Sequence, residues 1–147
     1  MQITRTALVP YSAEDMYGLV HHVPAYPQFL SWCVDAEVLE QDAQTQLAAL
    51  TVSIGGIRQR FVTRNRLEPG RALHMSLVEG AFRRLGGAWT FTPLNELGSK
   101  VALELGFEMD TSLVAAAFSA GFTRVADRMV RDFCQRAETV YGTTDSP

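Results

Sequence analysis

The feature that most constrains the fold is a long amphipathic segment near the end of the chain, residues 111–141. Its apolar residues recur at the spacing of one helical face, and most of its charged residues lie off that face. The apolar positions are Val114, Phe118, Phe122, Val125, Met129, Phe133, Ala137 and Val140. Ser112 or Thr111 can cap the first turn, and Gly142 follows where a left-handed terminal residue suits glycine. At 1.5 Å per residue this helix is roughly 45 Å long, which requires a wide apolar partner.

That partner is predicted to be a sheet built from the preceding chain. Residues 3–9 alternate as a strand, and Ser12 with Asp15 resembles a capping box for a short helix that ends near residue 22. Strands are then expected at residues 34–38, 47–54, 57–67, 73–79, 85–92 and 101–108. Gly55-Gly56 and Gly86-Gly87 are both interpreted as turns. Because strands at such short spacing pair antiparallel, we predict one α+β domain over residues 1–142: a curved antiparallel sheet of about six to seven strands around the C-terminal helix. Residues 143–147 are expected to be a disordered tail.

Composition and charge narrow the class of protein. The chain has 147 residues, is 47% hydrophobic and 20% charged, and carries a net charge of −3. This suits one globular domain and argues against binding of nucleic acid through bulk charge. Cys33 and Cys134 form no CxxC pair, and the N-terminus has no signal-peptide pattern. The longest apolar run, residues 113–118, is short of the roughly 20 residues that span a bilayer, so we expect a soluble cytoplasmic protein.

Catalytic and metal-binding patterns are weak. The histidines, His21, His22 and His74, match no ligand spacing with Cys33. The sequence contains no nucleophile elbow, no zinc-protease motif and no phosphate-binding glycine loop. Glu104 and Glu108 lie on the polar side of their strand. We therefore expect no enzyme activity, no metal and no required cofactor.

A basic stripe is predicted on one strand. Arg58, Arg60, Arg64 and Arg66 alternate along residues 57–67 and so share the outer face of the sheet, with Arg83 and Arg84 in a nearby loop. The commoner interpretation is a solvated face that protects a strand from aggregation. The functional alternative is contact with the phosphates of RNA or of an anionic membrane. Glu37 and Glu79 decide how much of this charge is neutralised if they lie beside the stripe.

The segment before residue 34 is too apolar for a simple linker. Pro24 and Pro27 interrupt it, which predicts a short helical or turn-rich connector over residues 23–33. Its large apolar residues are Tyr26, Phe29, Leu30 and Trp32. A curved sheet and a straight helix leave a gap between them that suits an apolar ligand. The connector plugs one end of this gap, forms the gate through which a ligand enters, or does both.

Taken together, these segments resemble the coenzyme Q-binding START-like family, within the polyketide cyclase-like helix-grip superfamily. The resemblance rests on VPAYPQFLSWC at residues 23–33, GAFRRLGGAWTFTP at residues 80–93 and the closing helix, and it covers residues 3–141. It implies a helix-grip fold with a hydrophobic tunnel. Eukaryotic members imply ubiquinone binding in support of respiratory electron transfer. Bacterial members, named for ribosome association and toxicity, imply binding to the large ribosomal subunit and interference with subunit joining.

Our first hypothesis is a non-enzymatic protein that holds an isoprenoid quinone such as ubiquinone, with peripheral contact at the inner membrane. Each buried methylene contributes about 0.8 kcal/mol, so a long tail needs no polar recognition. The predicted mouth is Tyr26, Phe29, Leu30 and Trp32, the floor is Trp89, Phe91, Leu103 and Leu105, and the roof is Phe118, Phe122, Val125 and Met129. The alternative is a translation inhibitor that contacts ribosomal RNA through the arginine stripe. A third, weaker option is a cyclase or hydrolase acting in the cavity. The sequence leaves open which lipid is bound and the oligomeric state.

Overall fold

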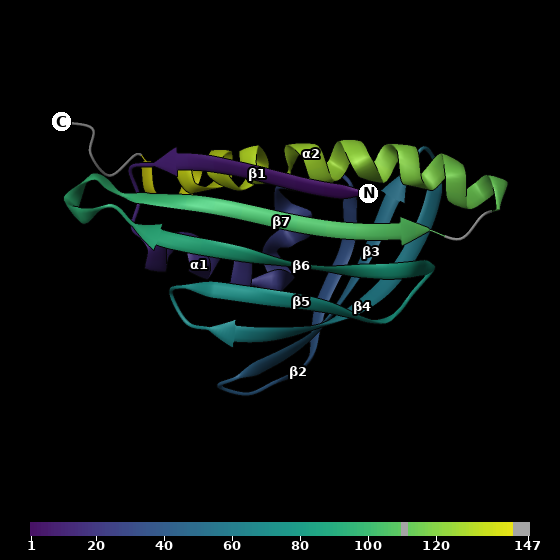
Figure 1. The fold of residues 1–147 in the computed structure, drawn as a ribbon, viewed down its shortest axis with the longest axis horizontal. Coiled ribbons are helices and arrows are strands. Elements are labelled where there is room, and N and C mark those ends of the chain that lie inside the picture. The colour runs from purple at the N-terminus through teal and green to yellow at the C-terminus, as the bar shows by residue number, and fades with distance from the viewer. Residues whose placement is uncertain (110–111, 143–147) are drawn as a thin grey trace.

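The computed structural model describes residues 1–109 and 112–142 of the chain. Its elements, in order, are β1 (Gln2–Val9), α1 (Ala13–His21), the 3₁₀ helix η1 (Val23–Gln28), β2 (Cys33–Gln41), β3 (Thr45–Ile54), β4 (Ile57–Glu68), β5 (Ala72–Glu79), β6 (Phe82–Pro93), the 3₁₀ helix η2 (Asn95–Leu97), β7 (Ser99–Met109) and α2 (Leu113–Tyr141). The seven strands form one antiparallel sheet in the order β1-β7-β6-β5-β4-β3-β2 (Figure 1).

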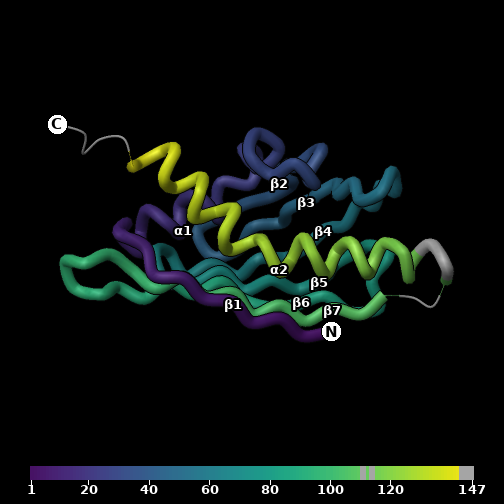
Figure 2. Tube along the Cα trace, turned by 90° about the horizontal axis from the view of Figure 1, so that it is seen from above, coloured from purple at the N-terminus to yellow at the C-terminus, as the bar shows by residue number. Residues whose placement is uncertain are grey.

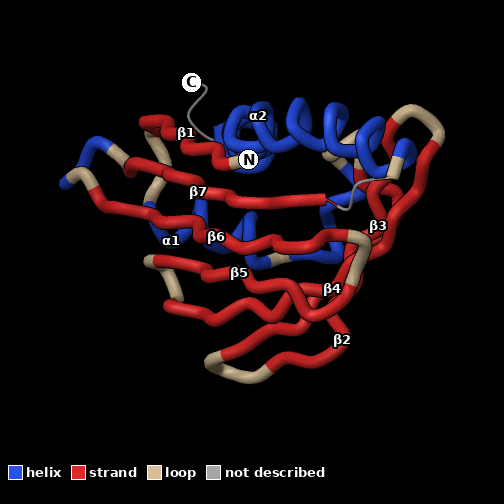
Figure 3. Tube along the Cα trace, turned by 45° about the vertical axis from the view of Figure 1, so that its right-hand side comes forward, coloured by secondary structure: helices blue, strands red, loops and turns tan. Residues whose placement is uncertain are grey.

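The sheet curves around α2. Seen from above, α2 runs between an arm made of β1, β6 and β7 and an opposite arm made of β2, β3 and β4 (Figure 2). Figure 3 shows the curvature of the strands beneath the same helix. The α+β prediction, a curved antiparallel sheet that grips a long C-terminal helix, is confirmed. Within the described residues, no helix has the length and hydropathy that crossing a bilayer requires.

Alternation assigns the faces of β7 correctly, whereas Val34, expected on the apolar side of its strand, is 39% exposed beside an irregularity in the pairing of β2 with β3 between Cys33 and Asp35. Val101, Leu103, Leu105 and Phe107 are all buried on the concave face of β7, and Glu104 and Glu108 point outward. Since side chains two residues apart share a face, the apolar positions of one strand meet those of its neighbours and of α2. The core is therefore continuous from the sheet to the helix.

Local signals at the helix starts are also confirmed. The Ser12 hydroxyl accepts a hydrogen bond from the Asp15 backbone N–H at 3.0 Å and caps α1. Ser112 does the same for α2 through the Ala115 N–H, also at 3.0 Å. The alternative cap Thr111 and the expected tail at residues 143–147 lie outside the described residues, as does the side chain of Val114.

Two predictions about the end of α2 are wrong. Gly142 has φ −72° and ψ −22°, a right-handed conformation, because its N–H continues the helical pattern by bonding to the Glu138 carbonyl. Val140 is 41% exposed although Ala137 is fully buried. Val140 comes three residues after Ala137, which places it about 60° around the helix from the buried line. In the last turn of α2 this rotation is enough to expose its side chain to solvent.

The glycine pairs have different roles. Gly55 and Gly56 make the β3–β4 turn with φ values of 56° and 82°, which side chains disfavour. Gly86 and Gly87, expected in a turn, instead lie inside β6. A Cβ on Gly87 would lie 2.0 Å from the Glu104 carbonyl oxygen on β7, so glycine permits a close approach of the two strands.

Arg83 and Arg84 were expected in a loop and lie in β6 as well. Arg84 pairs with Glu108 across the strands at 3.2 Å. The pairing of β6 with β7 is irregular between Phe82 and Arg84. Phe82 still pairs with Met109 beyond this irregularity, so β6 begins before residue 85, where alternation predicted its start.

Candidate functional site

An enclosed cavity lies between the concave face of the sheet and α2. Its volume is about 60 Å³. Its lining residues are Val20, Val23, Tyr26, Trp32, Ala48, Leu50, Phe61, Thr63, Asn65, Leu73, Met75, Leu85, Trp89, Leu105, Phe122, Met129 and Phe133. Larger depressions of about 660 and 700 Å³ are open to solvent and lie at turns and polar strand ends, so they lack this enclosure.

The structure brings some of the predicted ligand-binding residues to this cavity and leaves others in solid packing. The predicted residues in its wall are Tyr26, Trp32, Trp89, Leu105, Phe122 and Met129. Those outside its wall are Phe29, Leu30, Phe91, Leu103, Phe118 and Val125. All of the second group except Phe29 and Val125 are fully buried in the core. Their role toward a ligand stays a prediction.

Sequence reasoning missed the inner face of β4. Phe61, Thr63 and Asn65 occupy the odd positions of the strand whose even positions carry the arginines. A strand with arginines on one face must turn its other face inward, so the signal was present. Two of the residues on that inner face, Thr63 and Asn65, are polar, and polar residues are not expected in an apolar cavity wall.

Those polar residues belong to a buried hydrogen-bond network. Thr63 donates to Asn65 Oδ1 at 3.0 Å, and Asn65 Nδ2 donates to Gln46 Oε1 at 2.9 Å. Gln46 Nε2 then donates to the His21 carbonyl at 2.9 Å and to Gln41 Oε1 at 3.1 Å. The three members on β3 and β4 are at most 6% exposed. The network links the sheet to the end of α1.

The connector closes one end of the cavity. The Tyr26 hydroxyl donates to the Val20 carbonyl, and burial raises the pKa of this phenol far above its usual value. The rings of Tyr26 and Phe29 pack edge-on against Phe133 of α2, with centroids 5.3 and 5.2 Å away. The Arg136 guanidinium lies 4.9 Å above the Phe29 ring. In this packing the connector plugs one end of the cavity, and its predicted role as a gate stays a prediction.

The cavity wall offers little for acid–base chemistry. Among the described residues that line it, Tyr26 alone carries a titratable group. The nearby Cys33 thiol is protonated at neutral pH, because burial raises its pKa to about 11. A search of residues 1–109 and 112–142 finds no group of three or more His, Cys, Asp or Glu placed to hold a metal ion.

The arginine stripe lies on the outer face of β4, as predicted. All four side chains are exposed. Arg60 lies 3.3 Å from Glu79 and 3.7 Å from Glu37, and Arg66 lies 3.9 Å from Glu68. Arg58 and Arg64 have no ion-pair partner within the described parts of the chain. The acidic neighbours thus neutralise Arg60 and Arg66 in part and leave two free positive charges.

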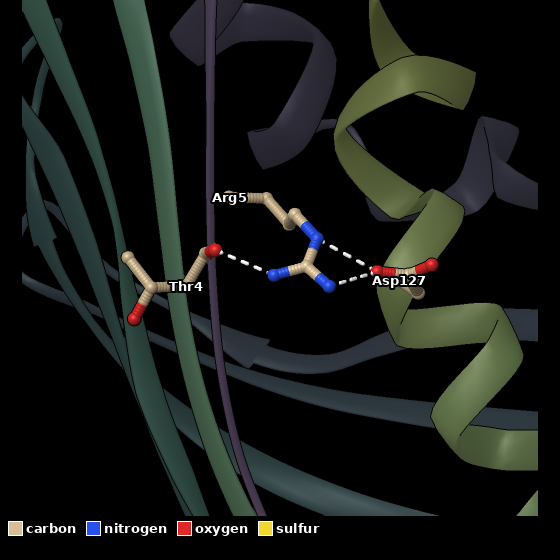
Figure 4. Close-up of polar contacts among 3 residues, drawn as sticks. All are labelled: Thr4, Arg5 and Asp127. Carbon is tan, nitrogen blue, oxygen red and sulfur yellow. Dashed lines mark hydrogen bonds and ion pairs between the residues drawn. The ribbon is translucent and has the colours of Figure 1, made fainter.

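A second set of arginines lies on the exposed face of α2. Arg124, Arg128 and Arg131 follow helical spacing on that face. Asp127, which directly precedes Arg128, is engaged by Arg5 of β1, whose Nε donates to it at 2.7 Å (Figure 4). Arg5 also donates to the Thr4 carbonyl at 2.8 Å, a bond within β1 that holds the guanidinium in place. Through its contact with Asp127, Arg5 ties the edge strand β1 to α2.

Comparison with known proteins adds three findings. A family model described as polyketide cyclase / dehydrase and lipid transport matches residues 9–134. The persistence and stress-resistance toxin PasT of Escherichia coli O6:H1 is 46% identical over 140 residues, covering 95% of this chain and 89% of that protein. The ribosome association toxin RatA of Escherichia coli K12 is 45% identical over the same length, with the same coverage.

More distant similarities are broader. The mitochondrial coenzyme Q-binding protein COQ10 homolog B of Xenopus laevis is 26% identical over 151 residues, covering the whole of this chain and 62% of that protein. The crystal structure of the Zhui aromatase/cyclase from Streptomyces sp. R1128 aligns with a TM-score of 0.82 at 17% identity, over 94% of this chain and 93% of that one. At that identity the structural match establishes the fold alone.

Proposed function

The chain belongs to the polyketide cyclase / dehydrase and lipid transport family. We propose that it is a non-enzymatic protein that associates with the ribosome in the cytoplasm. The observation that carries the proposal is identity of about 45% along nearly the whole chain with proteins named as ribosome association toxins. The mode of action proposed is binding to the large subunit in a way that hinders subunit joining. This was the alternative hypothesis from the sequence, and it now has the stronger support.

The outer face of β4 supplies a contact surface for RNA. Arg58 and Arg64 are exposed and lack an acidic partner within the described residues, so their charge is available to phosphates. A local pair of free arginines is compatible with the net charge of −3, since phosphate contacts depend on the charge at the interface. The described cavity wall has Tyr26 as its one titratable group, and burial raises the pKa of this phenol far above its usual value, which supports the non-enzymatic part of the proposal.

The test is co-sedimentation with purified large and small ribosomal subunits over a series of salt concentrations. The wild-type protein is expected to sediment with the large subunit and to lower the fraction of joined ribosomes. Arg58→Glu with Arg64→Glu should weaken binding on the order of tenfold and reduce the salt dependence, because each lost phosphate contact lowers the slope by about one. No association of the wild-type protein with either subunit would reject the proposal.

A matched control lies on the other basic face. Arg124→Glu with Arg128→Glu on α2 makes the same change of net charge at exposed positions. If binding depends on the β4 face, this variant should sediment like the wild type. If it alone loses binding, ribosome association stands and the contact surface is α2 instead.

A second candidate function is binding of a hydrophobic ligand in the cavity, with an isoprenoid quinone as the ligand first predicted. The apolar, enclosed lining supports it, as does the description of the family. The quinone itself rests on a relative of 26% identity and on the sequence resemblance. A cavity of about 60 Å³ is smaller than the roughly 150 Å³ cavity that accepts benzene, so a long tail requires α2 and the connector to separate from the sheet.

Extraction of the protein purified from its native host, followed by mass spectrometry, tests this candidate. Stoichiometric quinone would support the carrier function and make membrane contact through the arginine face worth testing with anionic vesicles. An extract without lipid, from protein that still binds ribosomes, would leave ribosome association as the function and count against the carrier.

A further inference from the structure

A wide groove crosses the convex face of the sheet over β1, β7, β6 and β5, strands that lie side by side in Figure 1. This convex groove has a volume of about 700 Å³ and is open to solvent. Its lining residues are Met1, Gln2, Ser76, Leu77, Arg83, Arg84, Leu85, Gly86, Gly106 and Phe107. The groove is therefore separate from the cavity, which lies on the concave face.

Two glycines form the floor of the convex groove. Gly86 of β6 pairs directly with Gly106 of β7, and both face the convex side, since the buried positions of these strands from residue 85 onward are odd-numbered. Neither glycine has a positive φ. A Cβ on Gly86 would meet only the Met75 carbonyl oxygen, at an ordinary 3.4 Å, and one on Gly106 would meet the end of the exposed Gln2 side chain. The backbone therefore does not require glycine here, as it does at Gly87, and the pair weakens its strands while it leaves the floor open.

The sheet also opens at this place. The pairing of β5 with β6 ends at Ser76 and Gly86, although β5 continues to Glu79 and β6 begins at Phe82. The two strands separate towards their connection at the right of Figure 1. In a regular antiparallel pair the ladder of hydrogen bonds would continue to the turn. The separation brings the edges of both strands into the wall of the groove.

The rim of the convex groove is positively charged. Arg83 and Arg84 are both exposed, and none of the described lining residues is acidic. Arg84 lies 3.2 Å from Glu108, whereas Arg83 has no ion-pair partner in the described parts of the chain. One guanidinium is thus free and the other is shared with an exposed carboxylate, so the groove favours an anionic ligand.

The convex groove is continuous with the arginine stripe of β4. Across the sheet, Arg64 is opposite Ser76 of β5, and Ser76 is opposite Gly86 of β6. Neighbouring strands are about 4.8 Å apart, so the floor lies about 10 Å from the backbone of Arg64. Arg64 is one of the stripe arginines without an acidic partner among the described residues. One extended ligand can therefore contact this arginine and reach the groove.

A nucleotide has the two properties that this surface matches, an anionic phosphate and a flat, uncharged base. Arginine side chains bind phosphates, and proteins that recognise single-stranded RNA stack its bases on flat groups, guanidinium planes among them. A floor without side chains lets a base approach the peptide planes closely. In a duplex the bases are paired and stacked on one another, so they do not enter such a groove.

We propose that the convex groove binds one unpaired nucleotide of RNA, with its base over Gly86 and Gly106 and the neighbouring phosphates on Arg83, Arg84 and Arg64. The inference rests on the proposed ribosome association and specifies the form of RNA that is recognised. That form is a single-stranded segment, such as a loop or a bulge, and not a continuous helix.

The test measures the binding of fluorescent probes to the full-length protein by anisotropy at one fixed salt concentration. The probes are a short oligouridylate, an RNA duplex of the same length and an oligoglutamate of the same length. The duplex presents phosphates without accessible bases, and oligoglutamate presents the charge of an acidic protein segment.

The main variant is Gly86→Val, which places an isopropyl group on the floor of the groove. Valine suits a strand and the position has no steric conflict, so the variant should fold, as circular dichroism can establish. If it does not fold, Gly106→Val closes the same floor from β7.

We expect Gly86→Val to bind oligouridylate about fivefold more weakly than the wild type does, the low end of what one stacked base contributes. Its affinity for the duplex should be unchanged. Arg83→Gln should weaken the binding of both RNA probes, because it removes a charge that contacts phosphate. The matched control is Ala88→Val, which adds methyl groups on the same face of β6 outside the groove and should bind every probe as the wild type does.

Equal binding of oligouridylate by Gly86→Val and the wild type would overturn the inference. An equal loss of affinity for the duplex would also overturn it, because the groove would then bind phosphates without a base. If oligoglutamate binds more tightly than oligouridylate and loses affinity in Gly86→Val, the groove takes an acidic protein segment instead.

Co-sedimentation separates these failures from failure of the proposed function. If the inference fails and the wild-type protein still sediments with the large subunit, ribosome association stands through other contacts. If the wild-type protein binds neither RNA probe nor ribosomal subunits, the inference and the proposed function both fail.

Discussion

Asn65 connects two parts of a buried network, accepting from Thr63 and donating to Gln46. Asn65→Leu keeps the volume but leaves the Gln46 amide oxygen without its donor. We expect a loss of about 1–3 kcal/mol in the free energy of unfolding, measured by chemical denaturation. Adding Thr63→Val should cost little more, because the threonine hydroxyl has then already lost its acceptor. Full additivity of the two changes would contradict a shared network.

His21 makes stability depend on pH. Its ring stacks on Tyr17, and its pKa is lowered, first by burial and then by the neighbouring His22. Because the unfolded chain takes up a proton near the ordinary value of 6.5 and the folded chain does so only at lower pH, stability falls as pH drops below about 6.5. His21→Phe keeps the stacking and removes this titration. The variant should match the wild type at pH 8 and lose less stability by pH 5 in thermal unfolding, and an unchanged pH profile would contradict this origin.

At the scale of elements, the connector and α2 stabilise each other through one aromatic residue. Phe133 contacts the rings of Tyr26, Phe29 and Trp89. Phe133→Ala removes these contacts and enlarges the cavity beneath them, which should cost about 3–5 kcal/mol of unfolding free energy.

The matched control for this change is on the same helix. Val140 is 41% exposed, so Val140→Ala should change stability by less than about 0.5 kcal/mol. Hydrogen exchange should also accelerate in η1 for Phe133→Ala, since its packing surface is lost. A cost similar to that of Val140→Ala would mean that the connector is held by other contacts.

At the scale of the whole molecule, the two candidate functions use opposite faces of one sheet. The cavity is on the concave face and the arginine stripe is on the convex face of the same strand, β4. The faces are physically separate, so each can be changed without the other. The fold thus permits ribosome association and ligand binding in a single domain.

This separation predicts independent effects. Ala48→Leu fills the cavity with added methyl groups and should abolish binding of apolar probes while leaving ribosome co-sedimentation intact. Arg58→Glu with Arg64→Glu should do the reverse. Phe122→Asp is a stronger version of the first change, and circular dichroism must establish that it folds. Loss of both activities in a folded Ala48→Leu protein would show that the two faces are coupled.

The sequence by itself determined the order of the elements and the faces they bury. Period-two alternation set Leu103 and Leu105 inward and Arg58 and Arg64 outward, and helical periodicity placed Phe118, Phe122 and Phe133 against the sheet. These are local properties, because the geometry of one strand or helix fixes which side chains share a face.

Only the tertiary structure decided which buried residues line open space. Leu103 packs solidly and Leu105 borders the cavity, although both have the same pattern and burial. Likewise, only cross-strand placement paired Arg60 with Glu37 and Glu79, put Gly87 against β7, and left the Trp32 N–H without an acceptor among the described residues. A cavity is the small volume that remains when whole elements pack, so it depends on where the sheet, α1 and α2 lie relative to one another. No single segment contains that information.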